Sequence, residues 1–337
     1  MSLAQEQQIN NNANPLTELS DLLKEDMDFV NALIIDKMQS DVPLIPQLAG
    51  HLIAAGGKRV RPLLTLACAA LFNYDGNRQY RLAASVEFIH TATLLHDDVV
   101  DESDQRRGKD TANLIFGNEA AVLVGDFLFS RAFQLMVEDG SIEALRVLSQ
   151  AAAVITQGEV LQIATSNDIA TTENEYLEVV KGKTAELFAA ACEVGGLVAE
   201  RSEDECQALR NYGLYLGIAF QIADDILDYS VSQGKLGKSI GDDFKEGKMT
   251  LPIIFALETA TDEERTFWKR CFQDNEQTDK DLEHGQQILS QHDALNKSLE
   301  RARYYGQKAK EALAIIPDSE IKGLLIQLID FTIERDY

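Results

Sequence analysis

The chain has 337 residues, of which 45% are hydrophobic, so it can bury a sizeable core in one large domain or two ordinary ones. Its formal net charge is −24, from 31 basic and 55 acidic residues, which argues against nucleic acid or an anionic membrane surface as the main partner. Four cysteines without C-x-x-C spacing, no signal peptide and no run of about 18 apolar residues predict a reduced, cytoplasmic protein.

The N-terminal segment, residues 1–14, is rich in Gln and Asn and ends before Pro15. This composition predicts a disordered extension. From Leu16 onward the pattern is helical, so residues 15–337 are expected to form one folded domain.

Along that domain apolar residues recur at intervals of three and four, as in Leu82, Val86 and Ile89, and strands do not alternate with helices. Thr172-x-x-Glu175 has the form of a capping box that opens a further helix. We therefore predict an all-α fold, a single-domain bundle of long helices around a central core.

A basic stretch, Gly56-Gly57-Lys58-Arg59-Val60-Arg61-Pro62, comes early in the helical region. Glycine lets a backbone approach a phosphate closely, and the arginine fork matches phosphate oxygens. The stretch predicts a phosphate site, and an ordinary basic surface turn is the simpler alternative.

Two aspartate clusters are the main chemical signal, Asp97-Asp98-Val99-Val100-Asp101 and Asp224-Asp225-Ile226-Leu227-Asp228. Each follows apolar residues, so each is expected on a mostly buried helix, where residues i and i+4 share one face. Unpaired carboxylates are costly to bury, so a cation must neutralise them. Mg²⁺, which takes one or two carboxylates and phosphate oxygens, is the expected ion. One such cluster alone would more simply be a solvated helix face, and the second copy favours metal binding.

Further basic residues follow both clusters. The segment 230–248 is glycine-rich and carries Lys235, Lys238 and Lys248, so it is expected to be a mobile loop that folds over bound phosphates. Solvated loop lysines are the simpler interpretation of each one. A second polar segment, 275–297, is expected to be a loop or an exposed helix pair.

Taken in order, these motifs resemble those of the trans-isoprenyl diphosphate synthases. The resemblance is carried by G-G-K-R-V-R-P, L-L-H-D-D-V-V-D-E-S-D-Q-R-R-G-K, G-K-T, F-Q-I-A-D-D-I-L-D and G-K-S-I-G-D-D-F-K-E-G-K. Within the family, the stretches 87–95 and 124–128 are most similar to the bacterial octaprenyl branch.

The resemblance implies an isoprenoid synthase fold with a central catalytic cavity in residues 15–337, normally as a homodimer. It implies a prenyltransferase that, with Mg²⁺, condenses isopentenyl diphosphate head to tail onto an allylic diphosphate such as farnesyl diphosphate. The implied product is octaprenyl diphosphate, used for quinone side chains such as that of ubiquinone. No membrane association is evident.

The resemblance also implies roles for individual residues. Mg²⁺ is expected on Asp97, Asp101 and Asp224, with support from Asp98, Asp225 and Asp228. Isopentenyl diphosphate is expected on Gly57, Lys58, Arg61, His90 and Arg107. The allylic diphosphate is expected on Arg106, Lys183, Thr184, Gln221, Lys238 and Lys248.

Product length is expected to depend on Ala92 and Thr93, which by the resemblance line the upper wall of an apolar tunnel. Both are small, which predicts an open tunnel and a product of about eight units, from the resemblance. Met136 is a candidate residue for the floor of this tunnel, and an ordinary methionine of the hydrophobic core is the alternative interpretation. Asp110 and Met249 depart from the family pattern.

Other functions remain open. A terpene cyclase or a head-to-head condensing enzyme could share the fold, but cyclases usually lack an isopentenyl site such as Lys58 and Arg61 would form. A noncatalytic subunit of a heteromeric synthase would typically lose an aspartate cluster, and both are whole here. An acidic helical interaction protein is a third alternative, and a decaprenyl, solanesyl or shorter product is not excluded.

Overall fold

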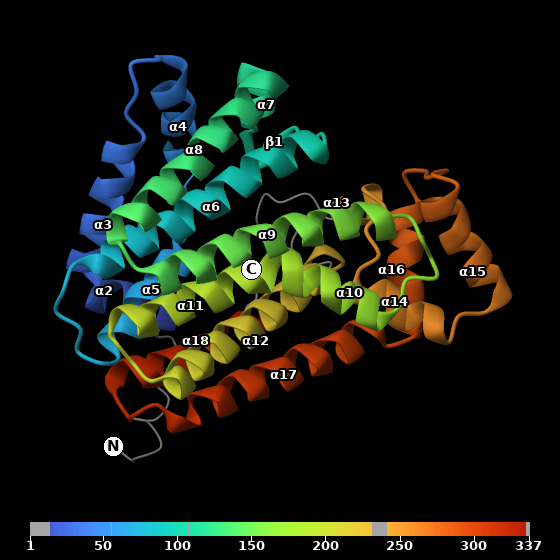
Figure 1. The fold of residues 1–337 in the computed structure, drawn as a ribbon. Helices are drawn as coiled ribbons and strands as arrows, with labels where there is room; N and C mark the ends of the chain where they lie inside the picture. Colours follow the sequence, from blue (N-terminus) through green and yellow to red (C-terminus); the bar gives the residue numbers. More distant parts are fainter. Residues whose placement is uncertain (1–13, 55, 107, 231–240, 335–337) are drawn as a thin grey trace, which may run out of the picture.

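Helices make up nearly the whole molecule (Figure 1). The computed structural model describes residues 14–54, 56–106, 108–230 and 241–334. Within these ranges the sheet structure is one short antiparallel hairpin of β1 (Gln105–Arg106) and β2 (Lys109–Asp110). The prediction of an all-α fold is confirmed.

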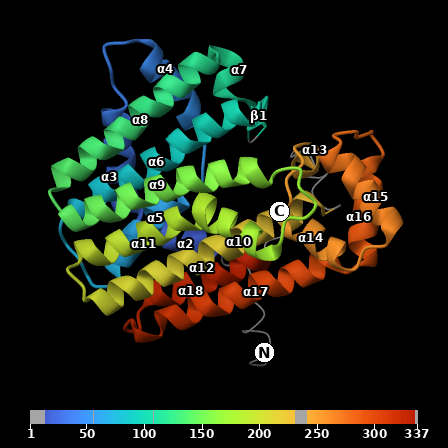
Figure 2. The same ribbon diagram turned by 45° about the vertical axis from the view of Figure 1, so that its right-hand side comes forward.

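The long helices form the centre of the molecule and lie side by side in Figures 1 and 2. They are α5 (Val60–Ala70), α6 (Arg78–Val100), α8 (Asn118–Asp139), α9 (Ile142–Thr165), α11 (Glu186–Val198) and α12 (Glu203–Asp228). α6 packs against α8, and α11 packs against both α5 and α12. Small side chains allow α11 to come close to its neighbours, since Ala189, Ala190 and Ala191 are all fully buried.

Shorter elements surround this centre. On one side are α2 (Pro15–Leu22), α3 (Lys24–Lys37), α4 (Leu44–Ala54) and α7 (Ala112–Phe116). α10 (Glu173–Val180) runs into a π-helical turn, η1 (Lys181–Ala185), before α11. α17 (Ala294–Ala312) covers α12 and is followed by the 3₁₀ turn η4 (Leu313–Ile315) and by α18 (Glu320–Glu334).

A lobe of short helices lies at one end of the bundle, on the right of Figure 1. It contains α13 (Asp242–Lys245), α14 (Leu251–Glu258), α15 (Asp262–Trp268), the π-helical turn η3 (Lys269–Gln273) and α16 (Asp281–Gln291). The polar segment 275–297 is therefore mostly helical, in α16 and the start of α17, as one of its two predicted forms requires.

Local capping explains where several helices begin. The predicted capping box of Thr172 and Glu175 is present at the start of α10. Asn14 accepts hydrogen bonds from the backbone of Leu16 and Thr17 and so caps α2, while residues 1–13 lie outside the described ranges. Such caps contribute about 1 kcal/mol each, so they place the helix ends and leave the core packing to hold the bundle together.

Two buried polar contacts fix the antiparallel register of α6 and α8. Arg78 donates to both carboxylate oxygens of Asp139 at 3.0 and 2.9 Å, and the Asp139 side chain is fully buried. Further along, Ser85 Oγ, which donates to the Arg81 carbonyl oxygen at 2.8 Å, also lies 3.3 Å from the Ala132 carbonyl oxygen of α8. This register sets Met136 of α8 opposite Arg81, near the start of α6.

α8 differs from the other long helices in its exposed face. Among the described helices it alone has the length and apolar character to cross a membrane, and 44% of its most apolar window is buried in the fold. Its buried face packs on α6, and its opposite face exposes Leu123 and Val137.

Candidate active site

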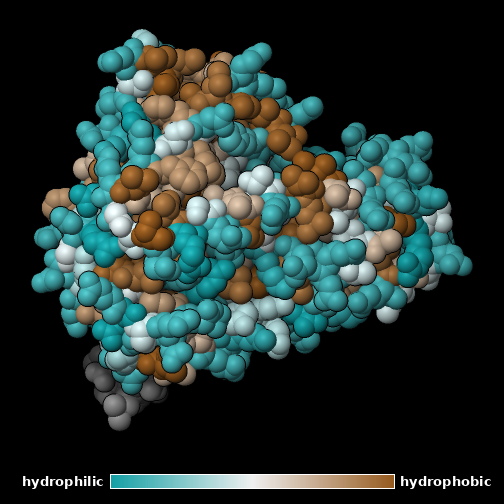
Figure 3. Space-filling view, in the orientation of Figure 1, coloured by the Kyte–Doolittle hydropathy of each residue, from teal (hydrophilic) through white to brown (hydrophobic). Residues whose placement is uncertain are grey.

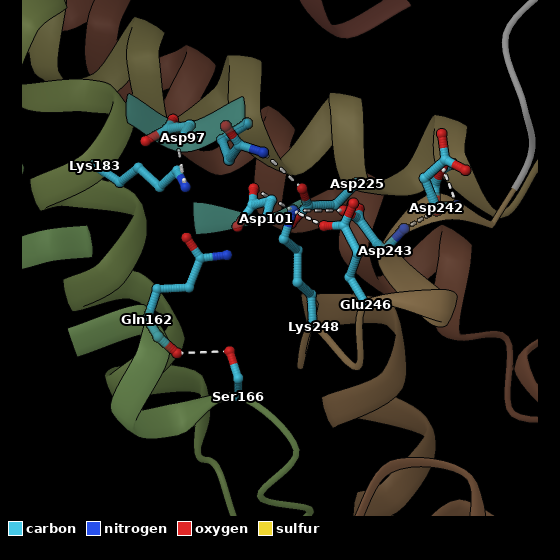
Figure 4. Close-up of polar contacts among 12 residues, drawn as sticks. Asp97, Asp101, Gln162, Ser166, Lys183, Asp225, Asp242, Asp243, Glu246 and Lys248 are labelled. Atoms are coloured by element: carbon cyan, nitrogen blue, oxygen red, sulfur yellow. Dashed lines mark hydrogen bonds and ion pairs between the residues drawn. The ribbon is translucent and has the colours of Figure 1, made fainter. Parts of the chain in front are cut away.

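The two aspartate clusters occupy the ends of two central helices. Asp97 and Asp98 lie in the last turn of α6, Asp101 caps that helix, and the second cluster ends α12. The C-terminus of a helix carries partial negative charge, so carboxylates placed there are further destabilised unless cations compensate. Lys248 Nζ lies 3.6 Å from Asp101 Oδ2 of the first cluster and 3.8 Å from Asp243 Oδ1, and the Asp243 backbone N–H donates to Asp228 of the second cluster (Figure 4).

Three of the clustered aspartates have their oxygens engaged by the fold. Asp98, 2% exposed, accepts a hydrogen bond from Arg106 Nε at 2.7 Å. Asp228 accepts from the backbone N–H groups of Asp242 and Asp243 and so holds the first turn of α13. Asp225 is buried beneath the site and bonded on both oxygens.

The other three aspartates, Asp97, Asp101 and Asp224, are half-buried. Burial raises the pKa of Asp97, Lys183 opposes that shift and Asp101 adds to it. Burial likewise raises the pKa of Asp228 to about 6, against the backbone donors that lower it. Burial is thus the first cause of both shifts, and a cation bound in the cleft would favour the ionised carboxylates.

Lys183 faces the first cluster from η1. Its Nζ lies 2.7 Å from Glu159 Oε2 and 3.7 Å from Asp97 Oδ2. The contact depends on a close crossing of α9 and η1, since a Cβ added at Gly158 would lie 2.5 Å from the backbone nitrogen of Lys183. Burial, followed by the charge of Asp97, raises the pKa of Glu159 to about 7.

Lys248 is enclosed by carboxylates. Burial alone would lower the pKa of Lys248, but Asp243, Asp101 and Glu246 together raise it, so the side chain stays charged. Burial also raises the pKa of Asp243 well above its usual range. Lys248 can thus present a positive charge to an anion in the cleft without losing its proton.

A second basic group lies on α5 and the preceding turn. Arg61 Nη1 is 3.2 Å from His90 Nε2, so the structure brings together two residues predicted to bind isopentenyl diphosphate. Gly57 and Lys58 are exposed in the same turn, whereas Arg59, which has a positive φ of 49°, pairs with the buried carboxylate of Glu87. Arg59 is therefore engaged by a buried carboxylate within the fold, while the Arg61 guanidinium lies over the Phe188 ring and beside His90.

A cavity of about 110 Å³ lies beside Lys183 and Lys248. Thr184 and Gln221, both predicted to bind the allylic diphosphate, line it. Asp243, from the last quoted motif, also lines it, together with three polar residues that no motif contains, Gln162, Ser166 and Tyr176. Each is a single polar residue, so no repeated spacing marks it in the sequence.

The remaining predicted residues lie as follows. Ala92 is fully buried, Thr93 is half-buried and donates to the His90 carbonyl oxygen, and Met136 is buried. Asp110 is exposed in β2 with its carbonyl oxygen 2.9 Å from His51 Nε2, and Met249 is buried at the cavity. Arg107, Lys235 and Lys238 lie outside the described residues.

Comparisons with known proteins place these features in context. The family model for polyprenyl synthetases matches residues 42–289. The chain is 44% identical to the octaprenyl diphosphate synthase of Escherichia coli over 95% of this chain and 99% of that protein.

Two solved structures are similar in fold. One is a decaprenyl diphosphate synthase from Rhodobacter capsulatus, with a TM-score of 0.92, 51% identity, and coverage of 95% of this chain and 98% of that one. The other is a polyprenyl synthase from Caulobacter crescentus complexed with calcium and isoprenyl diphosphate, with the same TM-score, identity and coverage.

Proposed function

This chain belongs to the polyprenyl synthetase family, and on that premise we propose that it is a long-chain trans-prenyltransferase that joins isopentenyl diphosphate to an allylic diphosphate. The observation that carries the proposal is a cleft in which Lys183 and Lys248 contact Asp97 and Asp101 of the first cluster. Lys248 also contacts Asp243, whose backbone N–H donates to Asp228 of the second cluster. An arrangement of carboxylates and lysines in one cleft suits a ligand that is itself a complex of cations and diphosphate.

The donor set fits Mg²⁺. In the described part of the chain, no three His, Cys, Asp or Glu side chains converge as a ready-made metal site. Mg²⁺ does not need one, because it keeps several waters and takes only one or two carboxylates plus substrate phosphates. From the family resemblance we assign Asp97, Asp101 and Asp224 to this role, and Asp97 and Asp101 lie at the cleft beside Lys183 and Lys248.

One group of residues around the cleft would bind the allylic diphosphate, and another would bind isopentenyl diphosphate. The chemistry that bound Mg²⁺ supplies is withdrawal of charge from the departing diphosphate. Lys183 and Lys248 hold the same diphosphate from two sides, and Arg106 holds Asp98 in place. Fixed charges in a water-poor cleft act more strongly than they would in bulk water.

On the opposite side, Lys58, Arg61 and His90 would hold isopentenyl diphosphate. Arg61 and His90 are already in contact, so these two members of the group are assembled before a ligand arrives. Preorganised cations of this kind orient the second substrate for attack on the allylic carbon. We propose no protein general base, because the departing diphosphate can accept the final proton.

We propose a product of about eight isoprene units, from the similarity to the Escherichia coli enzyme and the small wall residues Ala92 and Thr93. Met136 lies opposite Arg81, and the helix from Arg81 to Asp97 spans about 24 Å at 1.5 Å per residue. A prenyl tail can extend along that distance before it meets Met136. The 51% identity to a decaprenyl synthase favours ten units as the second candidate.

We also propose a homodimer formed through α8 and α9. These helices expose apolar residues on one face: Val122, Leu123, Phe133 and Val137 on α8 and Ile142, Val160 and Ile163 on α9. Figure 3 shows hydrophobic residues spread over the face that carries both helices. An apolar patch of this extent on one face is typical of a self-complementary interface in a symmetric dimer.

A cytoplasmic location and a role in making quinone side chains, such as that of ubiquinone, complete the proposal. The four cysteines are buried and unbridged, as in a reducing compartment. The quinone role follows only from the similarity to an octaprenyl diphosphate synthase.

Product analysis tests the proposed function. Purified protein is incubated with labelled isopentenyl diphosphate and with geranyl or farnesyl diphosphate, with Mg²⁺ or with EDTA. We expect a Mg²⁺-dependent prenyl diphosphate of about eight or ten units, from the family resemblance. Absence of any elongated product from every primer would refute the proposal, and a cyclic hydrocarbon would favour a cyclase.

A further inference from the structure

A chain of three hydrogen bonds runs along one wall of the cavity and ends at Tyr176. Thr184 Oγ1 donates to Gln221 Oε1 at 2.8 Å, and Gln221 Nε2 donates to Asp225 Oδ1 at 2.7 Å. The Tyr176 hydroxyl donates to Asp225 Oδ2 at 2.5 Å. All four side chains line the cavity.

Both ends of the Tyr176–Asp225 bond are shielded from water. Tyr176 is 5% exposed and Asp225 is 3% exposed. Without its tyrosine donor, one oxygen of a buried carboxyl group would be left without a partner, which is costly in a water-poor environment. Burial and the nearby aspartates raise the pKa of Tyr176 well above its usual range, so the hydroxyl stays a donor.

The chain fixes the direction in which the Gln221 amide points. The Gln221 NH₂ group donates to Asp225 Oδ1, and the other oxygen of that carboxyl group already accepts from the Tyr176 hydroxyl. The amide oxygen then faces Thr184, as observed. The NH₂ group has a second N–H, and because Gln221 lines the cavity, this N–H can donate to an anion bound there.

Tyr176 reaches this network from a separate element. It lies on α10, whereas Gln221 and Asp225 lie one turn apart on α12. The hydroxyl therefore ties α10, which leads directly into Lys183 and Thr184, to the helix end that carries Asp224.

We propose that Tyr176 is a positioning residue of the allylic-diphosphate site, which acts through Asp225 to aim the Gln221 amide at the ligand. The inference rests on the proposed function, because it requires a diphosphate in this cavity. Tyr176 itself does not take part in the reaction: it donates its only hydroxyl proton to Asp225.

The test compares Tyr176→Phe with Tyr80→Phe. Tyr80 also donates its hydroxyl to a carboxylate, Asp26 Oδ1 at 2.8 Å, but between α6 and α3. Titration calorimetry measures the binding of inorganic pyrophosphate in Mg²⁺, and steady-state kinetics gives KM for each substrate. We expect Tyr176→Phe to weaken pyrophosphate binding about tenfold and to raise KM for the allylic substrate, with KM for isopentenyl diphosphate unchanged. Tyr80→Phe should match the wild type in pyrophosphate affinity and in KM for both substrates.

Two results would overturn the inference. One is wild-type pyrophosphate affinity in Tyr176→Phe. The other is an equal rise in both KM values accompanied by a lower Tm, which indicates a purely structural role. A wild-type protein that elongates no primer would instead defeat the proposed function, so the two failures are distinguishable.

A double-mutant cycle tests whether Tyr176 acts through Asp225. If it does, Tyr176→Phe combined with Asp225→Asn should bind pyrophosphate as weakly as Asp225→Asn alone. Additive losses would show that Tyr176 acts by another route and would overturn the inference.

Discussion

Replacement of Gly158 by alanine should separate two elements that the site needs in contact. A Cβ at this position would lie 2.5 Å from the Lys183 backbone nitrogen and 2.8 Å from the Gly182 carbonyl carbon. Ordinary contact begins at 3.4 Å, so 3.4 minus 2.5 gives a displacement of about 0.9 Å between α9 and η1. The opposing atoms are backbone atoms, so no side chain can rotate out of the way.

The displacement acts on Lys183 and Glu159 together. A misplacement of about 1 Å in a catalytic group can cost on the order of 10²-fold in rate, so we expect kcat/KM for the allylic substrate to fall by about 10- to 100-fold. Overpacking costs about 1–3 kcal/mol. Alanine's better helix propensity returns about 1 kcal/mol, so the free energy of unfolding should fall by up to about 2 kcal/mol.

Gly323→Ala provides the matched control. Gly323 lies in α18, and a Cβ there would meet no atom within 4 Å. Incorporation of labelled isopentenyl diphosphate measures activity, and urea unfolding measures stability. The control should keep wild-type activity and gain up to about 1 kcal/mol. Wild-type kcat/KM and stability in Gly158→Ala would refute the reasoning, because they would show that the crossing can widen without cost to Lys183.

Three further predictions concern the tunnel wall at Ala92, the buried carboxyl group of Glu159 and the exposed apolar face of α8. Ala92→Tyr should fill the tunnel wall and shorten the product, as chromatography of the labelled prenyl chains would show; unchanged length would exclude this wall as a determinant. The pKa of Glu159 is raised to about 7 in the folded state, so its ionisation should lower the free energy of unfolding as pH rises from about 4.5 to 7. In urea unfolding at a series of pH values, Glu159→Gln should therefore show a weaker dependence of stability on pH than the wild type. Parallel profiles would contradict that assignment. Leu123→Lys should give a monomer in analytical ultracentrifugation while the equally apolar but remote Ile315→Lys leaves the dimer intact; a dimer in both would contradict the proposed interface.

The fold was predictable because its signals are local. The spacing of three and four in Leu82, Val86 and Ile89 is a property of one helix, and so is the capping box at Thr172. Both aspartate clusters belong to helices, as their spacing predicted, and the structure adds that each cluster lies at a helix C-terminus. The β1–β2 hairpin was not predicted, since strands of two residues leave no alternating pattern to detect.

Many side-chain contacts in the site were not predictable, because they join residues that are far apart in the chain. Tyr176 and Asp225 are separated by 49 positions, and Glu159 and Lys183 by 24. A lone Glu or Tyr in an amphipathic helix has the same appearance as a residue on a solvated face. The sequence also gives the three aspartates of a cluster the same appearance, whereas the fold engages Asp98, Asp225 and Asp228 and leaves Asp97 and Asp101 at the cleft.

Calorimetric titration with inorganic pyrophosphate tests the central claim most directly, namely that cations join the two aspartate clusters to a diphosphate. The account predicts tight binding in Mg²⁺, loss of binding in EDTA, and marked weakening by Asp97→Asn and by Asp224→Asn. Pyrophosphate binding of equal affinity with and without Mg²⁺ would contradict the claim, because the lysines and arginines alone would then suffice.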